Sequence, residues 1–213
     1  MSRRRPSSRS SRPPRRPGRG GGKLRIIGGD FRRRLLPVLD SPGLRPTPDR
    51  VRETLFNWLA AATPGARVLD LFAGTGALGL EALSRGAAEA VLVERDPRVA
   101  GALADNLTTL GLRQAEVITA DARPFLASSP PRPFSLVFVD PPFRQGLAGD
   151  CCAALEAGWL TEDAWIYLET EATLSPEVPA TWTLHREVRA GDSTGRLYRR
   201  TGEAGESPDG DAC

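Results

Sequence analysis

The chain has 213 residues, 40% of them hydrophobic and 26% charged, which suits one α/β domain with a full core. No apolar stretch approaches the roughly 20 residues of a membrane span, the arginine-rich N-terminus has no apolar signal segment, and three Cys with one His give no usual zinc-ligand spacing. We therefore expect a cytoplasmic protein with no membrane contact, no metal and no His-based catalysis.

The charge is divided unevenly along the chain. Residues 1–23 hold nine of the 29 Lys and Arg residues and no Asp or Glu, so the net charge of +3 combines a basic arm with an acidic body. Residues 1–22 are predicted to be a disordered basic arm, and residues 201–213 a disordered acidic tail. The arm either adds salt-dependent affinity for phosphates or is a solvated tail without a role.

Residues 23–63 are predicted to form an N-terminal hairpin and a helix. Paired short strands are expected over 24–29 and 34–38. Arginines gather around this hairpin and in the segment after it, which favours contact with phosphates. The candidate RNA-contacting residues of this unit are Arg25, Arg32, Arg33, Arg45 and Arg50.

The helix of this unit is predicted from Pro48 to Ala61, with Thr47 as the N-cap and Pro48 in the first helical position. The residues of its predicted buried face are Val51, Leu55, Trp58 and Leu59. Arg50 and Arg52 are predicted to face elsewhere, and a solvated helix face explains them nearly as well as phosphate contact does.

Residues 64–200 are predicted to form the second unit, which opens with a buried strand and a glycine turn. The pattern Gly74-x-Gly76-x-x-Gly79 leads into a helix near Ala77, and Glu94 follows Gly74 by 20 residues at the end of a second strand over 90–93. A carboxylate at this position accepts two ribose hydroxyls in nicotinamide enzymes and in methyltransferases. The glycine pattern alone therefore leaves both classes open.

Acidic residues follow three of the predicted strands. Asp70, Asp121 and Asp140 would meet at one edge of a parallel sheet, where open α/β sheets bind ligands. Asp70 is placed to reach the ammonium group of a methionine moiety, and Asp121 to accept from an adenine amine. Taken singly, each acid is also explained as a helix N-cap or a solvated loop charge.

The tetrapeptide Asp140-Pro141-Pro142-Phe143 directly follows the apolar run 134–139. Asp140 and the Pro141 carbonyl offer two acceptors for the hydrogens of an exocyclic amine, and Pro142 biases Pro141 toward an extended conformation. Phe143 offers a face on which a base can stack. Alone this is an ordinary Asp-Pro turn, but beside the three acids it favours a methyltransferase that acts on an amino group.

The remaining chain completes the predicted fold. A fifth strand is expected over 164–169, an amphipathic helix over 151–160, and a closing hairpin of 181–188 with 196–200 around Gly191 and Gly195. The predicted fold class is α/β, a Rossmann-like class I S-adenosylmethionine-dependent methyltransferase. Its sheet is expected to be mostly parallel and doubly wound, with an antiparallel C-terminal hairpin.

Several segments together resemble the bacterial RsmD family, whose members methylate N2 of one guanine in 16S rRNA of the small ribosomal subunit. The resemblance runs from about residue 24 to residue 200, and the arginine-rich arm departs from it. The segments that carry it are Leu24 to Gly29, Leu44 to Thr47, Asp49 to Leu59, Asp70 to Gly79, Asp140 to Arg144, Trp182 to Glu187 and Arg196 to Tyr198.

The resemblance implies S-adenosyl-L-methionine as the cofactor, and a small subunit or its assembly intermediate as the substrate, with ribosomal proteins near the site. The implied cofactor residues are Asp70, Phe72, Gly74, Gly76, Glu94, Asp121 and Ala122. The implied target-base residues are Asp140, Pro141 and Phe143, and Arg144 joins the RNA-contacting arginines.

Two alternatives remain. Another amino-group methyltransferase, acting on adenine N6 or on a glutamine side chain, would use the same tetrapeptide, often with Asn in place of Asp140. A non-catalytic RNA-binding Rossmann-like domain would be expected to lose the acidic cofactor residues, yet Asp70, Glu94 and Asp121 are all present.

Overall fold

A computed structural model describes residues 22–39, 47–130 and 132–201. Arg45, nearly all of the basic arm and the acidic tail beyond Thr201 lie outside the described residues. The helices are α1 (Asp49–Trp58), α2 (Ala77–Ser84), α3 (Pro97–Leu110), α4 (Ala122–Leu126) and α5 (Leu147–Leu155). The strands are β1 (Lys23–Arg25), β2 (Leu35–Pro37), β3 (Arg67–Asp70), β4 (Glu89–Glu94), β5 (Ala115–Thr119), β6 (Phe134–Val139), β7 (Leu160–Glu171), β8 (Trp182–Ala190) and β9 (Ser193–Arg200).

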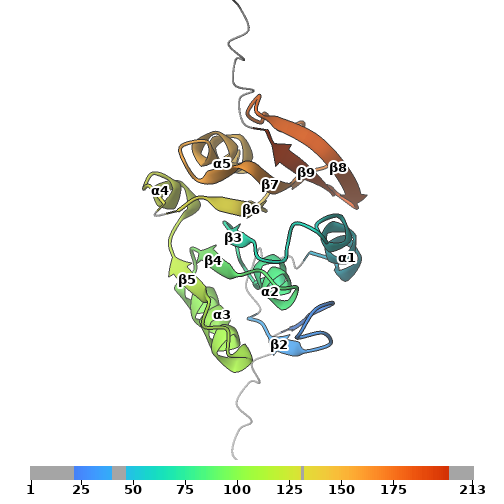
Figure 1. The fold of residues 1–213 in the computed structure, drawn as a ribbon, viewed down its shortest axis with the longest axis vertical. Helices are drawn as coiled ribbons and strands as arrows, with labels where there is room; N and C mark the ends of the chain where they lie inside the picture. The colour runs from blue at the N-terminus through green and yellow to red at the C-terminus, as the bar shows by residue number, and fades with distance from the viewer. Residues whose placement is uncertain (1–21, 40–46, 131, 202–213) are drawn as a thin grey trace, which may run out of the picture.

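The main sheet has the strand order β5-β4-β3-β6-β7-β9-β8 (Figure 1). Strands β3 to β7 run parallel, while β9 is antiparallel to β7 and to β8. The predicted doubly wound sheet with its C-terminal hairpin is confirmed. From β3 the chain adds β4 and then β5 on one side, and it then crosses back to add β6 on the other side of β3. The point between β3 and β6 is therefore the switch point, where such sheets bind ligands.

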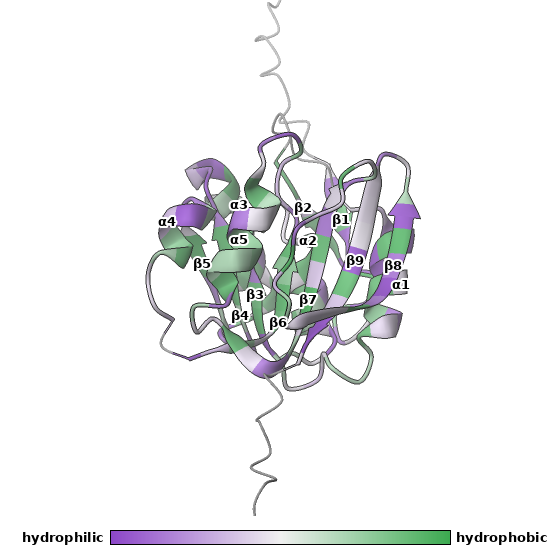
Figure 2. Cartoon of the chain, turned by 90° about the horizontal axis from the view of Figure 1, so that it is seen from above, coloured by the Kyte–Doolittle hydropathy of each residue, from purple (hydrophilic) through white to green (hydrophobic). Residues whose placement is uncertain are grey.

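Helices cover both faces of the sheet (Figure 1). One core cluster joins α1, α2 and α3 to Leu136 and Phe138 of β6, and a second joins α4 and α5 to Val137 and Val139. A strand covered on both faces needs an unbroken apolar run, and the central strands are mainly hydrophobic in Figure 2. None of the helices in the described ranges is long and apolar enough to cross a membrane.

The N-terminal hairpin forms a separate two-stranded sheet in which Leu24 pairs with Leu36. It docks on α2 through Glu81, whose carboxylate oxygens accept from the N–H groups of Ile27 and Gly28 at 2.8 Å each. Glu81 is fully buried and also accepts from Arg85 Nε at 2.7 Å. The Glu81 carboxylate thus satisfies the N–H groups of Ile27 and Gly28, which lie outside strands β1 and β2.

The prediction for Arg52 was wrong. Its side chain is 1% exposed rather than solvated, and its Nη2 donates to the carbonyl of Arg25 at 3.0 Å and to Asp49 Oδ1 at 2.5 Å. Its Nη1 lies 3.5 Å from Glu81 Oε2, without hydrogen-bond geometry. The arginine is buried because the hairpin packs over this face of α1 and supplies the Arg25 carbonyl as one acceptor, while Asp49 on α1 supplies the other.

Several element boundaries also differ from the predictions. The N-cap of α1 is Pro48, without a side-chain cap, because its carbonyl accepts the first helical N–H groups at Val51 and Arg52. Phe56 is fully buried, whereas Trp58 is only partly buried. Helix α5 lies earlier than predicted, and Leu160 begins β7. Gly191 lies in the hairpin turn with φ of 59°, but Gly195 lies inside β9.

Candidate active site

The carboxyl edge of the parallel strands collects the acidic residues of the candidate site. Asp70 ends β3, Glu94 ends β4, and Asp140 directly follows β6. Asp70 pairs in register with Leu92 of β4 on one side and with Phe138 of β6 on the other. The three acids therefore come from neighbouring strands on both sides of the switch point.

Glu94 accepts a hydrogen bond from the glycine turn between β3 and α2. Its Oε2 accepts from Gly74 N at 3.0 Å, and its Oε1 accepts from Asp96 N at 2.7 Å. Gly76 has φ of 77°, and a Cβ there would lie 2.4 Å from Leu103 Cδ1. Only glycine fits this position, because both the backbone conformation and the packing against α3 exclude a side chain.

Asp70 lies beneath this turn, with 2% of its surface exposed. Its Oδ2 accepts from Gly79 N at 2.9 Å, which ties the end of β3 to the first turns of α2. Burial raises the pKa of Asp70 to about 7, and the charge of Glu94 acts in the same direction. Hydrogen bonds from the N–H groups of Gly79 and Phe72 oppose that rise. Phe72 itself is half-buried in the turn.

Asp121 and Ala122 stand at the start of α4. Asp121 is the N-cap, and its exposed carboxylate accepts from Arg123 N at 3.3 Å through Oδ1. Ala122 is 4% exposed and belongs to the core cluster on the α4 side. The N-cap explanation for Asp121 thus holds in the structure, and it leaves Oδ2 available to a ligand.

Residues 140–143, here called the corner after β6, contain one acid and an aromatic ring. Asp140 and Phe143 are half-buried and Pro141 is buried. Burial raises the pKa of Asp140 well above its ordinary value, and the charges of Glu169 and Asp70 raise it further. Such a carboxylate is a stronger base than an exposed one, and perturbed acids of this kind cluster at functional sites.

Two residues of β7 belong to this site and were not identified from the sequence. Glu169 is 7% exposed and its Oε2 accepts from the buried Tyr167 hydroxyl at 2.9 Å. The available signal was the alternation of Tyr167 and Glu169 on one face of a strand expected to be covered on both faces. An acid inside an apolar parallel strand needs a reason, because burying a carboxylate is costly.

The predicted RNA-contacting arginines are distributed over three segments. Arg32 and Arg33 are exposed in the hairpin turn, where Arg33 has a left-handed φ of 70°, and Arg50 is exposed on α1. Arg25 is exposed, but its Nε donates to Asp49 Oδ2 at 3.0 Å. Arg144 is exposed beside the corner, with φ of 62°, and its N–H donates to Glu171.

The side chains of the described residues form no group of three or more His, Cys, Asp or Glu placed to hold a metal ion. Cys151 and Cys152 are buried in α5 as free thiols. Burial raises the pKa of the Cys151 thiol to about 11 and that of Cys152 to about 12. Neither thiol is a nucleophile at neutral pH.

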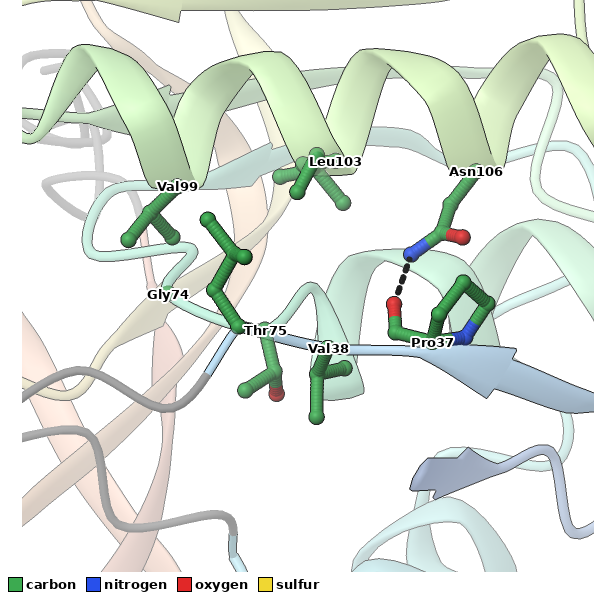
Figure 3. Close-up of a pocket in the computed structure, with 9 residues that line it drawn as sticks. Pro37, Val38, Gly74, Thr75, Val99, Leu103 and Asn106 are labelled. Atoms are coloured by element: carbon green, nitrogen blue, oxygen red, sulfur yellow. Dashed lines mark hydrogen bonds between the residues drawn. The ribbon is translucent and has the colours of Figure 1, made fainter. Parts of the chain in front are cut away.

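A small hollow touches the glycine turn from the side of β2 and α3 (Figure 3). Val99, Leu103 and Asn106 of α3 face Pro37 and Val38 across it, and Asn106 Nδ2 donates to the Pro37 carbonyl at 3.0 Å. The residues that complete its lining are Leu39, Gly74, Thr75 and Ala102. The hollow contains none of the carboxylates, so we assign the candidate site to the carboxyl edge of the sheet.

Comparison with known proteins gives a consistent result. The family described as "Conserved hypothetical protein 95" matches residues 24–199. Ribosomal RNA small subunit methyltransferase D from Escherichia coli K12 is 55% identical over 190 residues, covering 88% of this chain and 95% of that protein. The Haemophilus influenzae protein of the same name is 47% identical, covering 84% and 94% of the two chains.

A solved structure agrees with the sequence comparison. The structure of yhhF from Escherichia coli superposes with a TM-score of 0.80 at 51% identity, covering 85% of this chain and all of that one. The residues of the family match include the hairpin, the glycine turn and the corner after β6. The chain therefore belongs to the ribosomal RNA small subunit methyltransferase D (RsmD) family and is a methyltransferase.

Proposed function

We propose that this chain transfers the methyl group of S-adenosylmethionine to the exocyclic N2 of one guanine in 16S rRNA of the small ribosomal subunit. The observation that carries the proposal is the corner at Asp140, which adjoins the glycine turn across the switch point of the sheet. The names and high identity of the relatives support ribosomal RNA of the small subunit as the substrate.

The cofactor residues fit S-adenosylmethionine, which supplies an electrophilic methyl group on a positively charged sulfur. The turn at Gly74 and Gly76 leaves backbone rather than side chains at the strand end. Glu94 is proposed to accept the ribose hydroxyls, and Asp121 to accept from the adenine amine through its unoccupied Oδ2. Asp70 is proposed to attract the methionine ammonium. Phe72 and Ala122 line the same edge.

The residues proposed to bind the target base orient it and stabilise its developing charge. Asp140 and the Pro141 carbonyl hold the hydrogens of the guanine amine, so that its lone pair points at the methyl carbon, and Phe143 stacks on the ring. A base must leave its stack to enter the corner, which favours an unpaired nucleotide in a loop. Arg32, Arg33, Arg50 and Arg144 are proposed to contact phosphates, as are Arg25 and Arg45.

The assembled or partly assembled small subunit is the proposed substrate, in the cytoplasm, with ribosomal proteins forming part of the docking surface. The test is to methylate purified small subunits and naked 16S rRNA with labelled S-adenosylmethionine and to map the modified nucleoside. We expect N2-methylguanosine at one position, formed faster on subunits. Label on adenine N6 or on a glutamine side chain would support the rival amino-group methyltransferases, and no label on any acceptor would support the binding module.

A further inference from the structure

Glu169 lies beside Asp140 on the neighbouring parallel strand. Val139 of β6 pairs in register with Leu168 of β7, so Asp140 and Glu169 are the next residues along the two strands. Glu169 is 7% exposed, and the Tyr167 hydroxyl donates to its Oε2 at 2.9 Å. The buried Glu169 carboxylate is thus held by a neighbouring phenol, next to the half-buried Asp140 on the adjacent strand.

The Tyr167 side chain fits beside β9 because that strand has a glycine at the contact. Gly195 of β9 pairs with Glu169, and a Cβ at Gly195 would lie 2.2 Å from the Tyr167 hydroxyl oxygen. The Tyr167 ring packs edge-on against Phe138, with ring centroids 6.5 Å apart. Burial and the charge of Glu169 raise the pKa of Tyr167 well above its ordinary value, so the hydroxyl remains a proton donor.

The ionisable groups that face Asp140 from the neighbouring strands carry no positive charge. Asp70 faces it from β3, and Glu169 and Tyr167 from β7. Among the described residues, no ion pair joins a Lys, Arg or His to Asp140 or Glu169. Arg196 of β9 instead donates to Thr170 Oγ1 at 2.9 Å. The two carboxylates therefore repel each other without a counter-cation.

We propose that Glu169 is a positioning residue for the reaction: held by Tyr167, its charge acts through Asp140 and makes that carboxylate the acceptor of the proton that the guanine amine releases. The inference rests on the proposed function. As the N2 lone pair forms the new N–C bond, the C–S bond breaks and its electron pair stays on sulfur. The cationic nitrogen then passes one N–H proton to Asp140, which returns it to solvent.

The test uses Glu169→Gln, which keeps the size and one acceptor for Tyr167 but removes the charge. The first readout is a ¹³C NMR titration of the Asp140 carboxyl in the protein without substrate, assigned with Asp140→Asn. We expect its midpoint to move to lower pH. The second readout is the pH dependence of single-turnover methylation, whose acid limb should move in the same direction while the alkaline plateau falls about tenfold.

Glu162→Gln is the matched control, because Glu162 is an exposed acid at the other end of the same strand. It should leave both readouts unchanged. If Glu169→Gln fails to fold, Tyr167→Phe removes the hydrogen bond that holds Glu169 and should shift both readouts in the same direction by less.

An unmoved Asp140 midpoint, or a wild-type rate that does not vary with pH, would overturn the role of Glu169. Guanine N2 methylation would still support the proposed function in that case. A shifted Asp140 midpoint in a protein that methylates no guanine would instead contradict the proton transfer and the proposed function together, while leaving the electrostatic link between the two acids in place.

Discussion

Two groups of acidic residues with little solvent exposure lie on the same side of the sheet, and their surroundings differ in opposite ways. At the hairpin dock, Glu81 has four partners: the N–H groups of Ile27 and Gly28, and the guanidinium groups of Arg85 and Arg52. At the candidate site, Asp140 and Glu169 repel each other, and the Tyr167 hydroxyl donates one hydrogen bond to Glu169. The first arrangement stabilises the fold, and the second raises the energy of the charged folded state.

We infer from this difference that Glu81 serves the stability of the fold, whereas Asp140 and Glu169 serve the proposed chemistry. A buried carboxylate is tolerated when hydrogen bonds and cations compensate for its lost hydration. Where compensation is incomplete, the group has a shifted pKa and a stronger tendency to take a proton. We therefore expect that removing Glu81 destabilises the protein, while removing Asp140 or Glu169 at the candidate site costs activity rather than stability.

The largest expected effect is that of Glu81→Ala. The change leaves Arg52 buried without part of its compensation and leaves two hairpin N–H groups without acceptors, so we expect a loss of about 3–5 kcal/mol in the free energy of unfolding. Urea denaturation measures it. Glu53→Ala is the control, because Glu53 is exposed on α1. A loss no larger than that of the control would mean that the hairpin is held by its apolar contacts alone.

Asp70→Asn tests the catalytic side through pH. The folded pKa of about 7 lies above the ordinary aspartate pKa of 3.8, so the folded state binds more protons and wild-type stability falls as pH rises through this window. The variant keeps an acceptor for Gly79 N and escapes this loss. Its stability relative to wild type should therefore improve by up to about 4 kcal/mol between pH 4 and pH 8, measured by denaturation at each pH. A constant difference would contradict the raised pKa.

The sequence predicted the sheet well because its strands are covered on both faces and therefore read as apolar runs. It also predicted which strand ends carry Asp70, Glu94 and Asp140, since parallel strands share one carboxyl edge. It could not predict the burial of Arg52. Asp49 is a local partner one turn earlier on α1, but only the tertiary fold brings the Arg25 carbonyl and the Glu81 carboxylate to this side chain.

Glu169 was missed for a related reason. Its neighbour Asp140 lies 29 positions earlier in the chain, and the two become adjacent only through the pairing of β6 with β7. The shift of α5 had a local cause: Gly146, with φ of 65°, begins the helix, and Gly158, with φ of 86°, allows the turn into β7. Periodicity alone did not locate either turn.

Asp140→Ala should remove chemistry and leave the fold intact. We expect single-turnover methylation to fall by about 10²–10³-fold, the usual cost of losing a group that stabilises developing charge, with cofactor affinity close to normal. Asp140→Asn should lose less, because its amide oxygen keeps one acceptor without the charge. Unfolding measurements at pH 8 should show neither variant to be less stable than wild type. Full activity of Asp140→Ala would mean that the corner is only a turn.

The smallest expected effect is that of Glu94→Ala. Glu94 shares features with Glu81, which holds backbone N–H groups, and with the acids at the candidate site. Like Glu81, it accepts backbone N–H groups, from Gly74 and Asp96, yet it is only half-buried and ends its strand at the ligand edge. We expect S-adenosylmethionine to bind more weakly by about 1–3 kcal/mol in calorimetry, the scale of charge-assisted hydrogen bonds.

Two variants separate the roles of Glu94 in ligand binding and in holding the turn. Glu116→Ala, an exposed acid on β5, should bind the cofactor as wild type does. Glu94→Gln keeps one acceptor and can hold the Gly74 N–H, so it should recover part of the affinity if the turn matters more than the ribose contact. Unchanged affinity in Glu94→Ala would place the ribose elsewhere. Tight binding of NADH in place of S-adenosylmethionine would contradict the cofactor assignment itself, because both cofactors would use this carboxylate in the same way.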